Sequence, residues 1–328
     1  AIKYRSPDVE QLLQSRKVSY LRIPEQCGLQ EEVELLRGEL KMIGKTGVQA
    51  VVLDISHNYT LSQAQDLAGY SHQFHAITPC LALIDGLRKH ALAVLPGLEL
   101  DLVISPYVGS FPKDLPGFPL ERMLYGSEYF IFQEQYQSLA KETRTISDQA
   151  NKILLTFGGT DPQNITLKIL RALAHLQNES LEVRVIVGPA FSQDLVAEIT
   201  RLMSCSDHRV EIIRSPESIA RHMAWCDVAI SSTGLTKYEL AVMGVPSIQL
   251  SIDSAHEEMS KEFMTQGTAI HLGVHSQVSE SQVAAALIDL IHNPSLRKEM
   301  SVYGKRLLDG LGASRIASKL KEISHARK

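Results

Sequence analysis

A regular alternation of short apolar runs and helical patterns constrains the fold of this chain more than any other feature. In the second half, apolar runs of strand length lie at residues 152–157, 181–187, 210–213, 227–231, 246–252 and 268–272. Helical spacing of apolar residues separates several of them, as at 216–225. Strands that alternate with helices form a parallel sheet with helices on both faces. The sequence therefore predicts an α/β domain in this half.

The first half shows the same alternation less clearly. Strand candidates lie at 17–23, 50–55, 80–84 and 101–105, and helical patterns at 31–43 and 61–74. Around 134–150 the apolar periodicity is lost and polar residues dominate. Since 328 residues exceed the usual size of one compact domain, we predict two domains, 1–145 and 146–328, with a hinge near 140–150. Three helical patterns end the chain, at 279–291, 294–308 and 314–326, and the last could pack back on the first domain.

Charge, cysteine usage and hydropathy exclude several classes of protein. The net charge of −4 and the lack of any Lys/Arg run argue against nucleic-acid binding. No apolar run approaches the ~20 residues that span a bilayer, and the sequence shows no signal peptide. The four scattered cysteines are typical of small buried side chains in a reduced compartment. We therefore expect a cytoplasmic protein without a transmembrane segment.

A glycine pair follows the strand candidate at 152–157 and precedes a helical pattern. Gly158 and Gly159 allow the backbone to approach a ligand, and Thr160 follows them. Asp161 and Pro162 then suit an N-cap and the first position of a helix. The start of a helix offers unpaired N–H groups and the positive end of a dipole to an anion. The alternative is a tight strand-to-helix turn without a ligand.

A second loop of similar character follows the strand candidate at 227–231. Ser232, Thr233 and Gly234 could donate to phosphate oxygens from backbone and side chains, and a helical pattern follows them. Ligands of open parallel sheets bind beyond the carboxyl ends of the strands. Two such loops in one domain therefore predict that a diphosphate is held between two helix N-termini.

Two further polar residues of this half are candidates for the same site. Glu239 lies in the first turns of the helix after the second loop, where a carboxylate could accept both hydroxyls of a ribose. Alternatively, it only complements the helix dipole. His256, beside Glu257, follows the strand candidate at 246–252 and is a candidate ligand contact, although an isolated histidine is more often a surface or core residue.

Candidates for acid–base chemistry in the first half also follow or end strands. They are Asp54, His57 and Asp85. His72 and His75 share a helix face, but no carboxylate lies at metal-binding spacing. We therefore predict no metal site.

Four segments resemble a known family. The run L-L-T-F-G-G-T-D-P-Q-N-I-T (154–166) is similar to the strand–loop–helix of the pseudaminic-acid pathway hydrolase and its spore-coat-polysaccharide relatives. The run T-K-Y-E-L-A-V-M-G-V-P-S-I (236–248) looks like the segment in which such proteins carry a ribose-binding glutamate, here Glu239. Y-G-S-E-Y (125–129) and D-G-L-G-A-S-R-I (309–316) also look like family landmarks. The resemblance extends over most of the chain from about Val51 onward.

The resemblance implies a GT-B fold, in which two Rossmann-like domains face a central cleft and the C-terminal domain binds the nucleotide. The hydrolases of this family cleave the bond between UDP and an amino-sugar by adding water at the anomeric carbon, without a metal. UDP-sugar would then be the substrate, no further cofactor is implied, and the backbone near Arg214 would contact the uracil. The surface-polysaccharide and nonulosonic-acid pathways are the implied setting.

The sequence departs from this family at one place. The family opens with a first strand and a G-x-G-H-x-x-R loop, whose histidine is the favoured catalytic base. The sequence shows no such loop, and we expect Ala1 to correspond to a position around the family's second strand. Either the sequence lacks its natural beginning, or the protein has abandoned that chemistry. Asp54 or His57 is then the candidate base. Three hypotheses follow: a UDP-sugar hydrolase, a glycosyltransferase that uses the same nucleotide site, and a non-catalytic nucleotide-sugar-binding protein.

Overall fold

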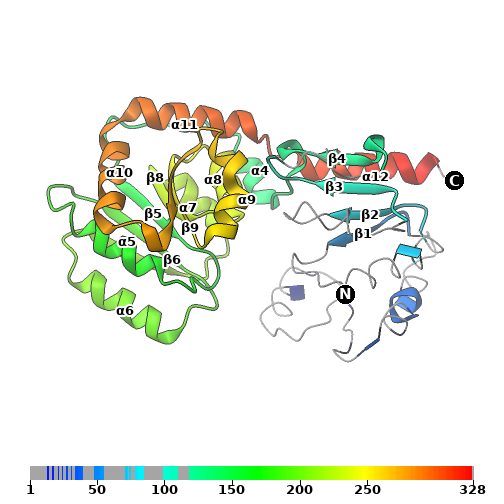
Figure 1. Ribbon diagram of the computed structural model, residues 1–328, viewed down its shortest axis with the longest axis horizontal. Coiled ribbons are helices and arrows are strands. Elements are labelled where there is room, and N and C mark those ends of the chain that lie inside the picture. Colours follow the sequence, from blue (N-terminus) through cyan, green and yellow to red (C-terminus); the bar gives the residue numbers. More distant parts are fainter. Residues whose placement is uncertain are drawn as a thin grey trace. The chain divides into compact units, whose positions relative to one another are not determined.

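A computed structural model shows that the chain divides into two compact units (Figure 1). It describes residues 48–54, 78–84, 99–109 and 118–326, together with scattered residues before residue 75. Unit 1 comprises Ala1–Tyr129 and Ser314–Lys328, and unit 2 comprises Phe130–Ala313. Each unit contains one parallel sheet among its described residues.

The sheet of unit 1 has four parallel strands in sequential order within the described residues. They are β1 (Val51–Asp54), β2 (Leu81–Ile84), β3 (Leu102–Ser105) and β4 (Met123–Tyr125), with the short 3-10 helices η1 (Leu120–Arg122) and η2 (Ser127–Tyr129) beside β4. The helix α12 (Gly312–Ala326) packs Ile316, Leu320 and Ile323 on one face of this sheet (Figure 1). Alternating strand residues such as Leu81 and Leu83 form a second cluster.

The sheet of unit 2 has six parallel strands in the order β10-β9-β8-β5-β6-β7. Their bounds lie within two residues of the strand candidates of the sequence: β5 (Lys152–Thr156), β6 (Glu182–Val187), β7 (Arg209–Arg214), β8 (Val228–Ser232), β9 (Ser247–Ser251) and β10 (Ala269–Val274). From β5 the chain adds β6 and β7 on one side, and then returns so that β8 pairs with β5 on the other. The strand order therefore reverses between β5 and β8.

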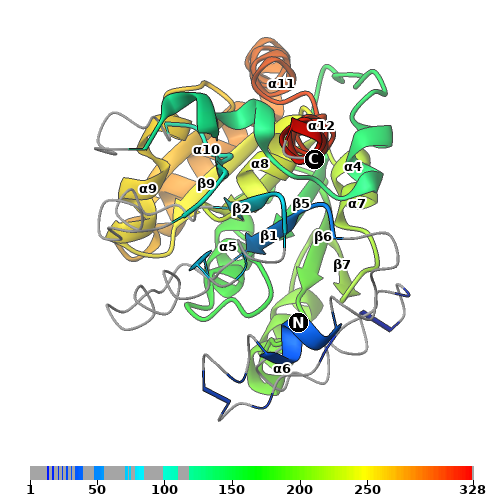
Figure 2. The same ribbon diagram turned by 90° about the vertical axis from the view of Figure 1, so that its right-hand side faces the viewer.

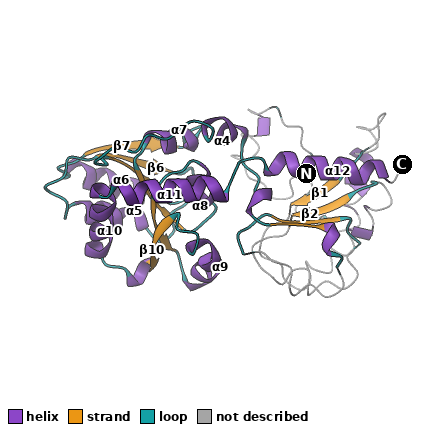
Figure 3. Cartoon of the chain, turned by 90° about the horizontal axis from the view of Figure 1, so that it is seen from above, coloured by secondary structure: helices purple, strands orange, loops and turns teal. Residues whose placement is uncertain are grey.

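Helices lie on both sides of the unit 2 sheet (Figure 3). They are α4 (Glu134–Leu139), α5 (Ile165–Leu173), α6 (Gln193–Ser204), α7 (Ile219–Trp225), α8 (Thr236–Val242), α9 (Ser254–Met264), α10 (Glu280–His292) and α11 (Pro294–Leu307), with the 3-10 helix η3 (His275–Gln277). The core packs α5, α6 and α10 on β5, β6, β8 and β9 through aliphatic side chains. The ribbons of α5 and α6 are visible in Figure 2. The sequence analysis did not predict α6, whose start is capped by Ser192, the side chain of which accepts from the Leu195 N–H.

The boundary between the units lies between Tyr129 and Phe130 rather than between residues 145 and 146. The polar segment that we interpreted as a hinge is fixed to unit 2 by three cations. Arg297, 1% exposed, donates to the carbonyls of Ser147 and Asp148, and Lys305 Nζ donates to Ala140 O at 3.2 Å. Arg144 donates to Met223 O at 3.1 Å. Backbone carbonyls, which sequence patterns do not reveal, anchor this segment.

The cysteine prediction holds at three of four positions. The four cysteines are thiols rather than disulfides, and Cys27, Cys80 and Cys226 are buried. Cys205 is exposed, because it follows the last turn of α6 as its C-cap. Burial raises the pKa of the Cys226 thiol to about 12. Within the described part of the chain, no helix has the length and apolar character needed to cross a bilayer.

Candidate functional site

The two predicted anion-binding loops leave adjacent strands at the same edge of the unit 2 sheet. β5 and β8 are hydrogen-bonded neighbours, with Thr156 in register with Ser231. We call residues 157–164 the β5 loop and residues 232–235 the β8 loop. Both begin where the strand order reverses, which is the usual place of a ligand site in an open α/β sheet. The structure thus brings together two segments that are more than 60 residues apart in sequence.

The glycines of the β5 loop lie against a neighbouring loop on one side and are open on the other. A Cβ at Gly188, after β6, would lie 2.5 Å from Gly159 O and 2.7 Å from Gly158 O, so only glycine fits there. Ala190 N–H also donates to Gly159 O at 3.0 Å. By contrast, a Cβ at Gly158 or Gly159 would meet no atom within 4 Å, and Gly158, Gly159 and Thr160 are all exposed. The loop is supported from behind and accessible in front.

The start of α5 differs from the prediction. Asp161 and Pro162 do not begin the helix, because Asp161 (φ 40°) and Asn164 (φ 52°) adopt left-handed backbone conformations and the helix starts at Ile165. The Asp161 carboxylate, 1% exposed, accepts from the N–H groups of Ile165 and Thr166, both at 2.9 Å. The protein itself therefore uses the first amides of α5. What the β5 loop can offer an anion is the backbone of residues 158–160.

The β8 loop contains one open position and two occupied ones. Thr233 is buried, its N–H donates to Leu250 O at 3.2 Å, and its Oγ1 lies 3.2 Å from Ser251 Oγ. Ser232 is also buried, as the last residue of β8. Gly234 is partly exposed, and its N–H has no hydrogen-bond partner among the residues that the structure describes. The Gly234 amide is therefore one donor that this loop presents.

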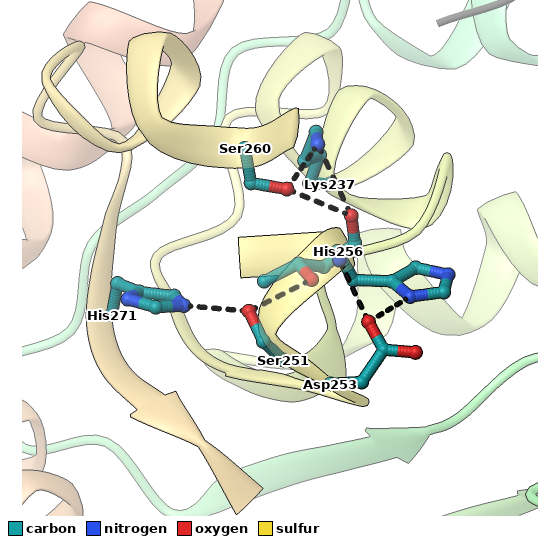
Figure 4. Close-up of polar contacts among 7 residues, drawn as sticks. Lys237, Ser251, Asp253, His256, Ser260 and His271 are labelled. Atoms are coloured by element: carbon teal, nitrogen blue, oxygen red, sulfur yellow. Dashed lines mark hydrogen bonds and ion pairs between the residues drawn. The ribbon is translucent and has the colours of Figure 1, made fainter. Parts of the chain in front are cut away.

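A buried lysine lies beneath the β8 loop, and our sequence analysis missed it. Lys237, 2% exposed, donates from Nζ to Thr233 O at 3.1 Å and to Ser260 Oγ at 2.8 Å (Figure 4). Burial lowers the pKa of Lys237 to about 8. A signal was present, since this lysine is enclosed by the apolar residues of a short helix between two buried strands.

Glu239 is largely buried and is paired with a tyrosine from α4. The Tyr136 hydroxyl forms a side-chain hydrogen bond with the Glu239 carboxylate. Burial raises the pKa of Glu239, and the hydrogen bond from Tyr136 opposes this rise. Burial, followed by the Glu239 charge, raises the pKa of Tyr136. A carboxylate held by one donor keeps further lone pairs for other hydroxyls. Sequence reasoning identified Glu239 but not Tyr136.

His256 interacts with the residue that caps α9. The Asp253 Oδ1 accepts from the backbone N–H of His256 at 2.8 Å and lies 2.7 Å from its Nδ1 (Figure 4). The backbone hydrogen bond, and then the imidazole, hold the pKa of Asp253 below its usual range. The pair is exposed and follows β9, the strand next to β8. This geometry accounts for a structural role and leaves the proposed ligand contact open.

The remaining candidates lie elsewhere or outside the described residues. Arg214 is exposed at the end of β7, two strands from β5. Asp54 is exposed at the end of β1 in unit 1. His57, Asp85 and His75 lie outside the described residues. Among the residues that are described, no cluster of three His, Cys, Asp or Glu side chains is placed to hold a metal ion.

Comparison with known proteins identifies distant relatives by sequence. No protein-family model matches the chain. An uncharacterized protein of Methanocaldococcus jannaschii is 28% identical over 178 residues, covering 52% of this chain and 36% of that protein. The spore coat polysaccharide biosynthesis protein SpsG of Bacillus subtilis is 26% identical over 203 residues, covering 62% of this chain and 59% of SpsG. The matches thus span about a third and somewhat over half of these relatives' lengths.

A third sequence relative and two solved structures extend the comparison. The UDP-N-acetylglucosamine–N-acetylmuramyl-(pentapeptide) pyrophosphoryl-undecaprenol N-acetylglucosamine transferase of Desulfotalea psychrophila is 22% identical over 242 residues, covering 71% of this chain and 64% of the transferase. Acinetobacter baumannii MurG matches 96% of this chain and 87% of its own, with a TM-score of 0.63 and 14% identity. UDP-GlcNAc 2-epimerase from Neisseria meningitidis, bound to UDP-GlcNAc, matches 96% of this chain and 88% of its own, with a TM-score of 0.61 and 16% identity. These structures confirm the predicted GT-B fold with its two parallel-sheet α/β units.

Proposed function

We propose that the chain binds a UDP-sugar through unit 2 and acts as an enzyme of surface polysaccharide or nonulosonic-acid biosynthesis, with hydrolysis of the bond to UDP as its reaction. One observation carries the proposal: two loops with open glycines leave adjacent strands at the point where the strand order reverses. The likeness to an epimerase bound to UDP-GlcNAc and to a spore coat polysaccharide protein supports the choice of ligand and setting.

Each part of the nucleotide has a proposed contact. The diphosphate binds the backbone of Gly158, Gly159 and Thr160 on one side, and Ser232, Thr233 and Gly234 on the other. Of these, Gly234 N–H is the free donor, whereas the buried Thr233 side chain supports the loop. In the same proposal, Glu239 contacts the ribose hydroxyls and the backbone near Arg214 contacts the uracil. His256 contacts the ligand beyond the end of β9.

The reaction needs a base but no change of oxidation state. A water oxygen forms a bond to the anomeric carbon, the bond from that carbon to the diphosphate oxygen breaks, and UDP leaves with the electron pair. A side chain that removes the water proton typically contributes a factor of about 10²–10⁴ in rate. We propose Asp54 or His57 for this role, because the exposed Asp54 ends a parallel strand of unit 1 at its carboxyl end.

Glycosyl transfer is the second candidate, because one sequence relative is an N-acetylglucosamine transferase. It would use the same nucleotide site and replace water by an acceptor hydroxyl. The difference between the two reactions lies in the attacking oxygen, so the acceptor decides between them.

Incubation of the purified protein with a panel of UDP-sugars tests the proposal. Release of free sugar and UDP without an acceptor supports hydrolysis, and release only with an added acceptor supports transfer. Tight UDP binding without turnover would show a binding protein that lacks catalysis. No binding of UDP or of any UDP-sugar would contradict the proposed function as a whole.

Asp54→Asn provides the matched catalytic control. If Asp54 is the base, turnover falls by a factor of about 10²–10⁴ while UDP affinity stays nearly unchanged, because a base acts on the transition state rather than on nucleotide binding. Unchanged turnover in Asp54→Asn would exclude Asp54 and leave His57.

A further inference from the structure

The ammonium of Lys237 is buried among neutral partners. Its Nζ donates to Thr233 O and Ser260 Oγ, and Ser260 Oγ also lies 3.3 Å from Thr233 O. Tyr238 and Phe263 present their rings 5.5 and 5.3 Å from the same nitrogen. No carboxylate pairs with Lys237 within the described residues. Buried charges in proteins are normally paired, so this one lacks its counter-charge.

The position of the ammonium links it to the surface of the β8 loop. Thr233 O, its acceptor, belongs to the same peptide group as Gly234 N–H, and the two point in opposite directions across that group. Gly234 N–H has no partner among the described residues, and a Cβ at Gly234 would meet only Ser232 Oγ, at 3.9 Å. A cation bound to the carbonyl polarises the peptide and strengthens the opposite N–H as a donor.

We propose that Lys237 is a positioning residue of the diphosphate site: it polarises the Thr233–Gly234 peptide toward the ligand, and the bound diphosphate supplies the counter-charge that the buried ammonium lacks. This inference rests on the proposed function, since it assumes that the β8 loop binds the diphosphate. In addition to the backbone amides, the site then contains a positive charge, the Lys237 ammonium. This charge lies on the far side of the Thr233–Gly234 peptide and does not touch the ligand.

Few other titratable groups surround Lys237. His271, on β10, is linked to it through Ser251 and Thr233, with Ser251 Oγ 3.0 Å from His271 Nε2 (Figure 4). Burial and then Lys237 itself lower the pKa of His271, whereas Glu257 on α9 opposes this. Glu239, on the same helix as Lys237, pairs with Tyr136. The pKa of Lys237, which burial lowers to about 8, sets the pH range of the test.

The consequence is a pH dependence of diphosphate binding. An anion favours the charged lysine, so the pKa of Lys237 rises on binding, and binding above the free-protein value of about 8 requires uptake of a proton. The affinity for UDP relative to uridine should then fall about tenfold between pH 7 and pH 9. Uridine shares the base and its ionisation but has no phosphate, so its own affinity corrects for other effects.

The experiment titrates UDP and uridine into three proteins at pH 7, 8 and 9. Lys237→Met replaces the ammonium by an apolar chain of similar length and should weaken UDP binding about tenfold at pH 7. In this variant, the affinity for UDP relative to the affinity for uridine should not change between pH 7 and pH 9. Lys261→Met is the matched control, because it removes one exposed lysine, paired with Glu258 on α9, and should keep the wild-type profile.

Each outcome decides the inference. A flat wild-type profile, or a Lys237→Met protein that keeps the wild-type profile, overturns the role of Lys237 while leaving UDP binding in place. If the wild type binds no UDP even at pH 7, the proposed function fails and the inference with it. Should Lys237→Met not fold, Ser260→Ala decides: loss of one acceptor for the ammonium lowers the pKa of Lys237, so the fall in affinity must move to lower pH.

Discussion

The β5 loop and the β8 loop share one pattern of strand, small residues and helix, but the structure gives them opposite electrostatics. Within the β5 loop lies the buried carboxylate of Asp161, which accepts from the first amides of α5. Beneath the β8 loop lies the buried ammonium of Lys237, which binds the carbonyl of Thr233. We therefore expect the β8 loop to be the stronger anion site, whereas the β5 loop offers an open, glycine-lined backbone.

This difference shows that the start of a helix is not by itself an anion site. The amides of a first turn are available only if the protein has not already used them, and Asp161 uses those of α5. What distinguishes the two loops is one buried side chain, Asp161 within the β5 loop and Lys237 beside the β8 loop. Substitutions of these side chains, of their neighbours or of the glycines test this difference, and they are taken in order of decreasing expected effect.

The largest effect is expected where the β5 loop touches its neighbour. Gly188→Val should destabilise unit 2 by about 1–3 kcal/mol or more, because even the Cβ would lie 2.5 Å from Gly159 O and backbone must move. It should also abolish UDP binding, since the β5 loop is displaced.

Gly159→Ala is the matched control, because its methyl group meets no atom within 4 Å. Its thermal unfolding midpoint should stay near that of the wild type, and only its UDP affinity should fall. Equal unfolding curves for both variants would contradict the packing described here.

The next effect concerns the ribose. Glu239→Gln should weaken UDP binding by about 1–3 kcal/mol, since it removes a charged hydrogen-bond acceptor. The same variant should be more stable at neutral pH. The pKa of Glu239 is higher in the folded than in the unfolded protein. The protonated carboxyl therefore adds stability below the unfolded-state pKa, and this stability is lost as the pH rises through the folded-state pKa. Glutamine stays neutral and avoids this loss. Denaturant unfolding and calorimetric titration at pH 7 measure the two changes.

Tyr136→Phe is the control for that prediction. It leaves the carboxylate in place but removes the hydrogen bond that opposes the rise in the pKa of Glu239. As the solution is acidified, the UDP affinity of Tyr136→Phe should therefore begin to fall at a higher pH than the UDP affinity of the wild type. A decline at the wild-type pH would show that Glu239 does not act as an ionised acceptor.

The smallest effect on binding is expected at Asp161. Asp161→Ala should cost about 0.5–2 kcal/mol of stability, because two amides of α5 lose their acceptor. UDP affinity should change little or increase, since a carboxylate is removed and amides are freed near the diphosphate. A clear loss of UDP affinity, with the fold intact, would mean that Asp161 orders the β5 loop for its ligand and that the contrast between the loops is smaller than we describe.

Sequence periodicity predicted the strands of unit 2 closely, because strands buried on both faces form continuous apolar runs such as β5 and β6. It did not predict β4, which has three residues, or the boundary at Phe130. The rings of Phe130 and Tyr238 stack with their centroids 4.3 Å apart. This contact between residues distant in sequence fixes the segment to unit 2. Such long-range contacts are invisible to local patterns.

The same limit applies to the site. Gly158, Gly159 and Glu239 could be found from the sequence, because their residue types and their position after strands carry the signal. The partners that decide what these residues can do could not be found this way. Asp161 reaches forward to cap α5, and Tyr136 comes from a helix about 100 residues earlier than Glu239.

A crystal structure of the chain with UDP tests the central claim most directly. The account predicts diphosphate oxygens about 2.7–3.2 Å from the backbone N–H groups of the β5 loop at residues 158–160 and from Gly234 N–H. UDP bound with its diphosphate away from both loops, while these amides face solvent, would contradict it.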